Sequence, residues 1–330
     1  MIVATAPGRC GIVGNPSDMY GGCVLSVTTR ERARCELVPG SALQIESGSE
    51  AAVVRGPADL ELRGDRLDIA RAALTWFGID PARHRFTLRL STDIPMQAGL
   101  AGSTALVAAA VGALDAWLGL GMNPWALAET ARKVEFRVMK VLCGLQDQHM
   151  AVFGGLCFMD FRGKEMLEQR DDEPLASMEP IHAFLPAHPT PLLLAHTGVR
   201  HHSGTVHRSP RQRWLEGDPQ VRAAYERIAD LARRAKRAWV EADWPLLGAL
   251  MDENHALVAE LGGSGPENDR LIAAARAAGA WGAKLAGAGG GGTVILLTDD
   301  PARVGAALMN AGADALYTPA PSPGLQVTAE

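Results

Sequence analysis

Alternating apolar and polar positions predict several strands in the first half of the chain. Residues 85–92, RFTLRLST, alternate with a period of two, the pattern of a half-buried strand. Residues 2–7, IVATAP, predict a first strand at the edge of a sheet, and residues 154–161, GGLCFMDF, predict another strand. In contrast, residues 103–118 are apolar on nearly every side and predict a buried helix.

A further helix has a clear start signal. Asn123 occupies the N-cap position and Pro124 the first helical position, and we expect the helix to run to about Leu142, before Gly144. The second half predicts helices at 221–241, 246–261, 268–278 and 302–310, and strands at 293–298 and around Leu316. Strands that alternate with helices in this way indicate an α+β sandwich of ferredoxin-like type.

A polar, proline-spaced stretch at 162–180 separates these two halves. We expect a domain boundary between this stretch and Pro191. The chain is therefore divided into an N-terminal domain, 1–185, and a C-terminal domain, 186–330.

Composition and charge exclude several classes of partner. The 330 residues are 47% hydrophobic and 21% charged, and the net charge is −5, which gives no basic footprint for nucleic acid or an anionic membrane. The apolar run 106–114 ends at Asp115 and is too short to span a bilayer. Five scattered cysteines without a C-x-x-C pair, and no signal-peptide pattern, predict reduced thiols in a cytoplasmic protein.

The stretch 96–106, MQAGLAGSTAL, joins a predicted strand to the buried helix. A helix N-terminus offers free backbone N–H groups and the positive end of the dipole, and glycines allow close approach of an anion. Ser103 and Thr104 add hydroxyl groups, but no lysine follows them. The loop therefore fits a phosphate, and an ordinary tight turn with a serine N-cap is the alternative.

Two other glycine clusters accompany this loop. Residues 284–297, KLAGAGGGGTVILL, contain G-x-G-x-x-G, but the glycines precede a strand, which argues against a dinucleotide fold. The run favours close approach of its backbone to a ligand or to another loop. Residues 6–22 place Arg9 and Asp18 around a glycine-rich turn. The Walker pattern is absent from the sequence, which argues against a P-loop nucleotidase.

Two carboxylates, Glu135 and Asp147, are candidates for binding a metal ion together with a nucleotide. At about 100° per residue, Glu135 falls opposite the basic face of its predicted helix, on the apolar stripe. A buried carboxylate must be paired, protonated or metal-bound, and an ion pair with Arg9 or Arg132 is the alternative to a metal. Asp147 follows in GLQDQ. Together with the phosphate-type loop, these residues suggest Mg²⁺-nucleotide chemistry.

The three glycine clusters, in this order, resemble the GHMP kinases. The matching stretches are APGRCGIVGNPSD, PMQAGLAGSTA with the extra residue Ala101, and KLAGAGGGG. Within the family, GIVGNPSD, GLAGST and GLQDQ are most similar to glucuronokinases. Asn15 and Pro16 stand where galactokinases have an acidic–His pair, so galactose is not expected. The resemblance implies a two-lobed α+β fold, with a first lobe like domain 2 of ribosomal protein S5 and a ferredoxin-like second lobe.

The resemblance also implies site roles. Mg²⁺ would bind Glu135 and Thr104 (or Ser103), Asp147 would face the attacking hydroxyl with Arg9 beside it, and Asp18 would accept bonds from sugar hydroxyls. The ATP phosphates would lie on Gly99, Leu100, Ala101, Gly102, Ser103 and Thr104.

The histidine- and arginine-rich segment 196–214 is a candidate for substrate recognition. Arg211 and Arg213 could bind a uronate carboxylate, with backbone of Gly287 and Gly289 as further contacts. The histidine spacing fits no familiar zinc pattern, and a solvated loop is the other alternative. The expected activity is ATP-dependent phosphorylation of D-glucuronate at its anomeric hydroxyl. A kinase for a heptose or galacturonate and a non-catalytic sensor are the alternatives, and a homodimer is compatible with the sequence.

Overall fold

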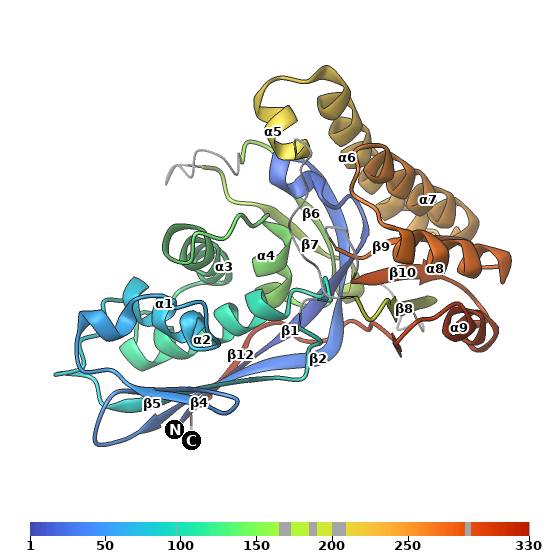
Figure 1. Ribbon diagram of the computed structural model, residues 1–330. Coiled ribbons are helices and arrows are strands. Elements are labelled where there is room, and N and C mark those ends of the chain that lie inside the picture. Colours follow the sequence, from blue (N-terminus) through green and yellow to red (C-terminus); the bar gives the residue numbers. More distant parts are fainter. Residues whose placement is uncertain (97, 165–172, 185–189, 200–208, 288–291, 330) are drawn as a thin grey trace.

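The computed structural model describes residues 1–96, 98–164, 173–184, 190–199, 209–287 and 292–329. Over these ranges the chain forms two sheets covered by helices (Figure 1). The first sheet has the order β12 (Gln326–Ala329), β1 (Ile2–Val13), β2 (Cys23–Pro39), β5 (Phe86–Thr92), β3 (Gln44–Ser47), β4 (Glu50–Val53), with β6 (Leu156–Asp160) and β7 (Ser177–Pro180) joined through β2. The second has the order β11 (Ala315–Tyr317), β8 (Leu192–His196), β10 (Thr293–Leu297), β9 (Gly282–Leu285).

The long strand β2 connects the two ends of the first sheet. Residues 33–39 pair with β5, whereas residues 23–27 pair with β6. Its partner β1 runs beside it with register shifts between Pro7 and Arg9 and between Gly11 and Val13. Such irregularities bend a strand and re-aim its side chains. They lie on the part of β1 that carries Arg9.

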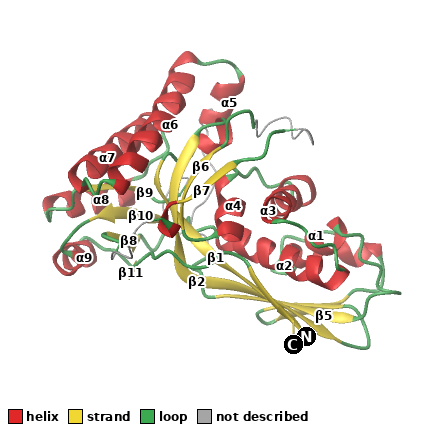
Figure 2. Ribbon diagram, turned by 180° about the vertical axis from the view of Figure 1, so that it is seen from behind, coloured by secondary structure: helices red, strands yellow, loops and turns green. Residues whose placement is uncertain are grey.

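Four helices pack on one face of this sheet (Figure 2). They are α1 (Asp68–Trp76), α2 (Gly102–Leu118), α3 (Pro124–Lys133) and α4 (Gln146–Phe153). Helix α2 is buried along most of its length, which confirms the prediction made from its all-round apolar character. The strands predicted at 85–92 and 154–161 are confirmed as β5 and β6.

The predicted helix from Pro124 to Leu142 is shorter than expected. It continues beyond α3 as one π-helical turn, η3 (Val134–Val138), and ends there. Lys140 has φ +59°, a left-handed conformation that cannot extend a right-handed helix. This turn redirects the chain into α4.

The second sheet carries the remaining long helices. Helices α6 (Pro219–Val240), α7 (Trp244–Glu260), α8 (Pro266–Ala277) and α9 (Pro301–Asn310) confirm the four predicted in this half, and a short helix α5 (Pro210–Leu215) precedes them. Helix α6 also packs against β1 and β2 of the first sheet and against α7, which in turn packs on β9 of the second sheet. No helix among the described residues is long and apolar enough to cross a membrane.

The expectation that the first strand lies at a sheet edge is wrong. Strand β12 pairs with β1 antiparallel, from Ile2 opposite Ala329 to Thr5 opposite Gln326, so β1 is an interior strand. The four residues of β12 are all exposed and show no alternation that could have predicted a strand. The proposed boundary at 185/186 lies outside the described residues, and the last strand of 186–330 joins the first sheet.

Candidate active site

The three glycine-rich segments meet at Arg9. Its backbone N–H donates to Leu100 O at 3.1 Å, and its Nη1 donates to Gly99 O at 2.7 Å and to Ala286 O at 3.5 Å. Gly8 makes this approach feasible, since a Cβ there would lie 2.9 Å from Leu100 O. The Arg9 side chain is thus almost fully buried between segments that are distant in sequence.

The third glycine run packs directly on the second. A Cβ at Gly287 would lie 2.9 Å from Gly99 O, and one at Gly292 would lie 3.1 Å from Ala98 O. Only residues without a side chain allow this contact. The prediction of close backbone approach to another loop is confirmed at Gly287 and Gly292, whereas Gly289 lies outside the described residues.

The start of α2 has no side-chain cap among the described residues. Its N-cap is Ala101, in a left-handed conformation with φ +59°, and no described side chain caps the helix. The alternative of a serine N-cap is therefore wrong. The N–H groups of Gly102, Ser103 and Thr104 are available for an anion, as the macrodipole favours.

A cleft of about 1010 Å³ opens beside this helix start. Ser103 and Met96 line it, together with residues from several segments that the sequence did not single out: Ser47, Gly48, Glu50, Gly64, Asp65, Arg66, Asp68, Ile69, Leu90, Ser91, Thr92, Leu106 and Met139. The cleft is continuous with the phosphate-type loop, and its walls come from β3, β5, α1 and the loops between them.

Glu135 is buried, as its position on the apolar stripe predicted. Its Oε1 accepts a hydrogen bond from Thr104 Oγ1 at 2.8 Å, and its Oε2 accepts one from Gln148 Nε2 at 2.5 Å. The alternative of an ion pair with arginine is not borne out, since both partners are neutral. Burial raises the pKa of Glu135 to about 7, although these two hydrogen bonds oppose the shift.

The donor set around Glu135 fits Mg²⁺ shared with phosphates. Glu135 and Thr104 offer hard oxygen donors side by side at the start of α2. A buried carboxylate with neutral partners lacks a compensating cation. Among the described residues no three His, Cys, Asp or Glu side chains could hold a metal by themselves. Mg²⁺ commonly uses one or two carboxylates and completes its shell with water and phosphate oxygens.

Asp147 lies in the first turn of α4 and forms an ion pair with Arg9. Its Oδ1 lies 2.7 Å from Arg9 Nε and 2.6 Å from Arg9 Nη2. The Asp147 side chain is 23% exposed, whereas Arg9 is 7% exposed. The carboxylate is therefore held by a buried cation and remains partly exposed.

Asp18 binds the backbone at the start of α4. Its Oδ2 accepts the backbone N–H of Leu145 at 2.8 Å and of Gln146 at 3.1 Å. Burial raises the pKa of Asp18. Gly144 is required here, since a Cβ would lie 2.1 Å from the Asp18 carboxylate. The structure thus places Asp18 as a cap of α4, with only 1% of the residue exposed.

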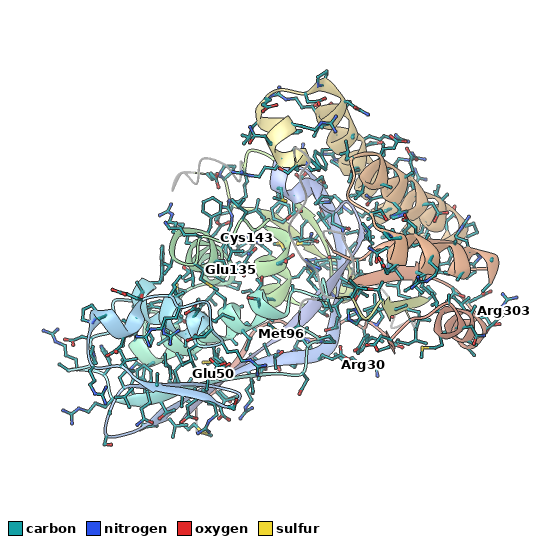
Figure 3. All side chains as sticks on the ribbon, viewed as in Figure 1. Arg30, Glu50, Met96, Glu135, Cys143 and Arg303 are labelled. Carbon is teal, nitrogen blue, oxygen red and sulfur yellow. The ribbon has the colours of Figure 1, made fainter. Side chains whose placement is uncertain are left out.

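Two side chains near Glu135 were not singled out by sequence reasoning. Figure 3 shows Cys143 close to Glu135, and burial raises the pKa of its thiol, with the nearby carboxylates of Glu135 and Asp147 adding to the shift. Gln148 is fully buried, and its Oε1 has no hydrogen-bond partner among the described residues. For Gln148, the sequence signal was a polar side chain directly after Asp147 on a helix that is mostly buried.

The two arginines of α5 have different surroundings. Arg213 donates to Asp218 Oδ2 at 2.8 Å and to Gln220 Oε1 at 3.0 Å, which ties α5 to α6. Arg211 Nε is buried and has no hydrogen-bond partner among the described residues. Burial raises the pKa of Tyr20, and the neighbouring Tyr225 and Asp18 add to the shift, whereas the positive charge of Arg211 opposes it.

Aromatic rings connect this region to the turn after β1. The ring centroid of Tyr20 lies 4.2 Å from that of Tyr225 and 4.6 Å from that of Trp214. In Figure 1, α5 lies next to the blue segment that contains Tyr20. Arg211 is therefore placed at the same end of the molecule as Asp18.

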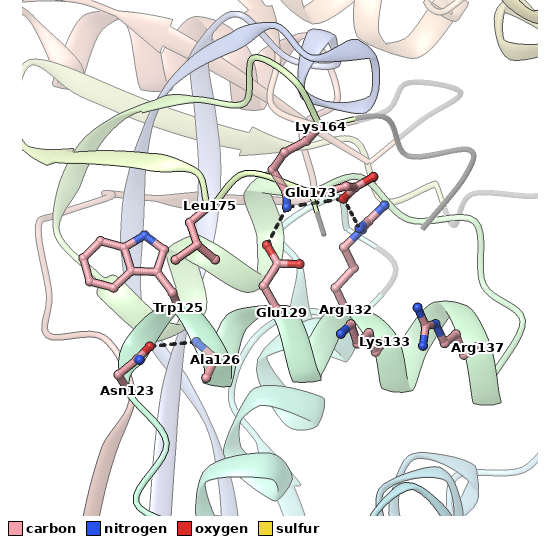
Figure 4. A pocket seen from close by; sticks show the side chains of 10 residues that line it. All are labelled: Asn123, Trp125, Ala126, Glu129, Arg132, Lys133, Arg137, Lys164, Glu173 and Leu175. Atoms are coloured by element: carbon pink, nitrogen blue, oxygen red, sulfur yellow. Dashed lines mark hydrogen bonds and ion pairs between the residues drawn. The ribbon is translucent and has the colours of Figure 1, made fainter. Parts of the chain in front are cut away.

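A separate pocket of about 220 Å³ lies beside α3 (Figure 4). In it, Lys164 Nζ lies 2.9 Å from Glu129 and 3.4 Å from Glu173. His149 of α4 approaches Glu129 at 3.7 Å, and burial lowers the pKa of this histidine to about 4. These contacts anchor α4, and we assign the cluster a structural role.

Two family models match the chain. One, the N-terminal domain of GHMP kinases, covers residues 66–155, and the other, the C-terminal domain of GHMP kinases, covers residues 228–314. The first contains Glu135 and Asp147, and the second contains Gly287.

The chain belongs to the GHMP kinase family. It is 30% identical over 322 residues to an Arabidopsis thaliana protein named probable glucuronokinase 2, covering 90% of this chain and 84% of that protein. It is 27% identical over 347 residues to a Pyrococcus furiosus mevalonate kinase, covering 99% and 98%. The GHMP kinases act on small molecules with ATP as phosphoryl donor, and this chain is such a phosphotransferase.

Solved structures agree with the fold. The crystal structure of a D-glycero-D-manno-heptose 1-phosphate kinase from Bacteriodes thetaiotaomicron has a TM-score of 0.74 at 19% identity, covering 100% of this kinase and 99% of that chain. The expected two-lobed α+β fold is therefore confirmed.

We predict that Asp18→Ala destabilises the kinase by about 1–3 kcal/mol, because two N–H groups at the start of α4 lose their acceptor. Urea denaturation measures the change. Asp18→Asn retains an acceptor oxygen and should lose less. Equal stability of Asp18→Ala and the wild type would show that Asp18 does not cap the helix.

Proposed function

We propose that this kinase transfers the γ-phosphoryl group of ATP to the anomeric hydroxyl of a uronic acid, D-glucuronate. The observation that carries the substrate class is Arg211, whose buried Nε has no hydrogen-bond partner among the described residues. Arginine binds carboxylates in a bidentate manner, so a uronate carboxylate would satisfy it. The similarity to a relative named probable glucuronokinase 2 supports the same acceptor.

In this proposal, ATP occupies the side of the site built on α2. Its phosphates accept hydrogen bonds from the backbone of Gly99–Thr104, and its nucleoside fills the adjoining cleft of about 1010 Å³. Support comes from the uncapped helix start and from the direct continuity of loop and cleft. The helix N-terminus thus replaces the lysine of a P-loop.

Mg²⁺ would be held by Glu135 and the hydroxyl of Thr104. Thr104 is favoured over Ser103, because Thr104 already contacts the Glu135 carboxylate. When bound, the ion neutralises charge on the phosphate oxygens. Gln148 orients Glu135 from the other side through its amide group.

Asp147 and Arg9 serve the acceptor. The exposed part of Asp147 accepts a hydrogen bond from the attacking hydroxyl and orients it, while Arg9 fixes the carboxylate and adds positive charge beside the transferred group. Phosphoryl transfer depends mainly on positioning and electrostatic stabilisation, so a weak base suffices. Asp18 contributes by holding α4, and the backbone near Gly287 completes the pocket.

A coupled ADP-release assay across acceptors tests the proposal. D-glucuronate should give the highest kcat/KM in a panel with D-galacturonate, D-glucose, a heptose and mevalonate. A different preferred acceptor would replace glucuronate in the proposal. ATP binding without ADP release for any acceptor would favour a sensor, although the presence of Arg9, Glu135 and Asp147 argues against that role.

Asp147→Asn keeps the shape of the side chain and removes its charge. We expect kcat to fall by about 10²- to 10⁴-fold, as for loss of a positioned acid–base group, while an ATP analogue still binds. Steady-state kinetics and calorimetry measure the two effects. Near-normal turnover would remove Asp147 from the acceptor site.

Glu135→Gln should raise the Mg²⁺ concentration needed for half-maximal activity, since a hard cation prefers a charged oxygen ligand. The variant retains the hydrogen-bonding shape, so its melting temperature serves as the folding control. An unchanged Mg²⁺ titration would leave Glu135 with a structural role only.

Arg211→Leu should narrow the preference for glucuronate over glucose. A hydrogen bond to a charged group contributes about 1.5–3 kcal/mol, or roughly ten- to a hundredfold in kcat/KM. Arg213→Leu is the matched control, since Arg213 is already paired with Asp218. If only Arg213→Leu changes the preference, the assignment to Arg211 is wrong.

A further inference from the structure

The turn Gly14–Pro16 links β1 to the short helix η1 (Ser17–Tyr20), and it is held by the second lobe. Asn15 is only 2% exposed, and Gly14 has φ +111°. A Cβ at Gly14 would lie 2.2 Å from Cys23 O and 2.9 Å from Ala232 Cβ. The turn is therefore packed too closely to move independently of α6.

Asn254 of α7 holds the backbone of this turn. It is fully buried, and its Oδ1 accepts the N–H of Gly14 at 2.8 Å. Its Nδ2 donates to Asn15 O at 3.3 Å. The carboxamide of Asn254, from the second lobe, thus satisfies one backbone N–H and one backbone carbonyl of the turn, as a neighbouring strand would.

Lys284 of β9 holds the side chain of the turn. Its Nζ donates to Asn15 Oδ1 at 2.8 Å, to Gly11 O at 3.5 Å and to Leu285 O. These acceptors are neutral, and burial lowers the pKa of Lys284 to about 7. Burial of an ammonium group without a carboxylate is costly, so packing alone does not explain a lysine at this position.

Asn15 connects this contact to the phosphate side of the site. With its Oδ1 fixed by Lys284, its Nδ2 donates to Gly287 O at 3.2 Å. Gly287 in turn packs on Gly99. In the other direction, the turn leads to Asp18, which caps the helix that carries Asp147.

We propose that Lys284 and Asn254 are positioning residues that hold the Gly14–Pro16 turn so that the acceptor side of the site is in register with the ATP phosphates. This inference rests on the proposed kinase site, and it holds for whichever acceptor that site uses. Neither residue lines the nucleotide cleft. Substitution of either residue should therefore change kcat and the KM for the acceptor, and leave ATP binding largely unchanged.

Lys284→Met and Asn254→Leu test the proposal with the acceptor that the wild-type enzyme uses best. We expect kcat/KM for the acceptor to fall by about a hundredfold, the effect of a displacement near 1 Å, with the dissociation constant of an ATP analogue within about twofold. Asn268→Leu is the matched control, because Asn268 is equally buried but lies on α8. It should leave acceptor kinetics unchanged.

Asn15→Ala distinguishes positioning from a general effect of charge. If Lys284 acts through Asn15, the double variant Lys284→Met/Asn15→Ala should be no worse than the more impaired single variant. Additive losses, wild-type acceptor kinetics in Lys284→Met, or an equal loss of ATP binding would each overturn the proposal.

A crystal structure of Lys284→Met provides a readout that does not depend on activity. Displacement of Asn15 and Ser17–Tyr20 is expected, and an unmoved turn would contradict the proposal. If the wild type phosphorylates an acceptor other than glucuronate, the proposed substrate fails, whereas this structural test of the turn stands.

Discussion

The site depends on the hydrogen bonds and the ion pair made by the guanidinium of Arg9. One side chain bonds the carbonyl of the phosphate loop, the carbonyl before the last glycine run and the carboxylate of Asp147. These groups come from both lobes and lie 90 to 277 residues from Arg9 in the sequence. A planar cation with several fixed donors can satisfy them together, whereas a lysine offers a single point charge. One residue therefore fixes the positions of these three segments relative to one another.

Two buried ionisable groups with neutral partners lie close to this site. Glu135 is hydrogen-bonded to a hydroxyl and an amide, and Lys284 to an amide and carbonyls. These hydrogen bonds restrict the orientation of both groups, and burial shifts the pKa of each toward its neutral form. Such groups reduce stability in the free protein, which is typical of sites that are completed by a ligand.

Much of the fold could be predicted because its signals are local. The all-round apolar character of α2, the period of β5 and the Asn–Pro start of α3 each depend on a few consecutive residues. The end of η3 at a left-handed Lys140 had no such signal. In the site, Glu135 could be placed on a buried face, but the contacts of Gln148, Asn254 and Lys284 depend on tertiary packing. The cleft beside the start of α2 could not be predicted, because its walls come from segments far apart in the chain.

The pairing of β1 with β12 has a consequence for how the chain acquires its structure. Ile2 lies opposite Ala329, so the sheet begun by the first residues is completed by some of the last. A growing chain exposes the outer hydrogen-bonding edge of β1 until nearly all of these residues have been synthesised. Contacts of such long sequence separation form slowly, and an unpaired strand edge is a site for association with other chains. Until β12 pairs with Ile2–Thr5, a chaperone that covers this edge of β1 would prevent such association.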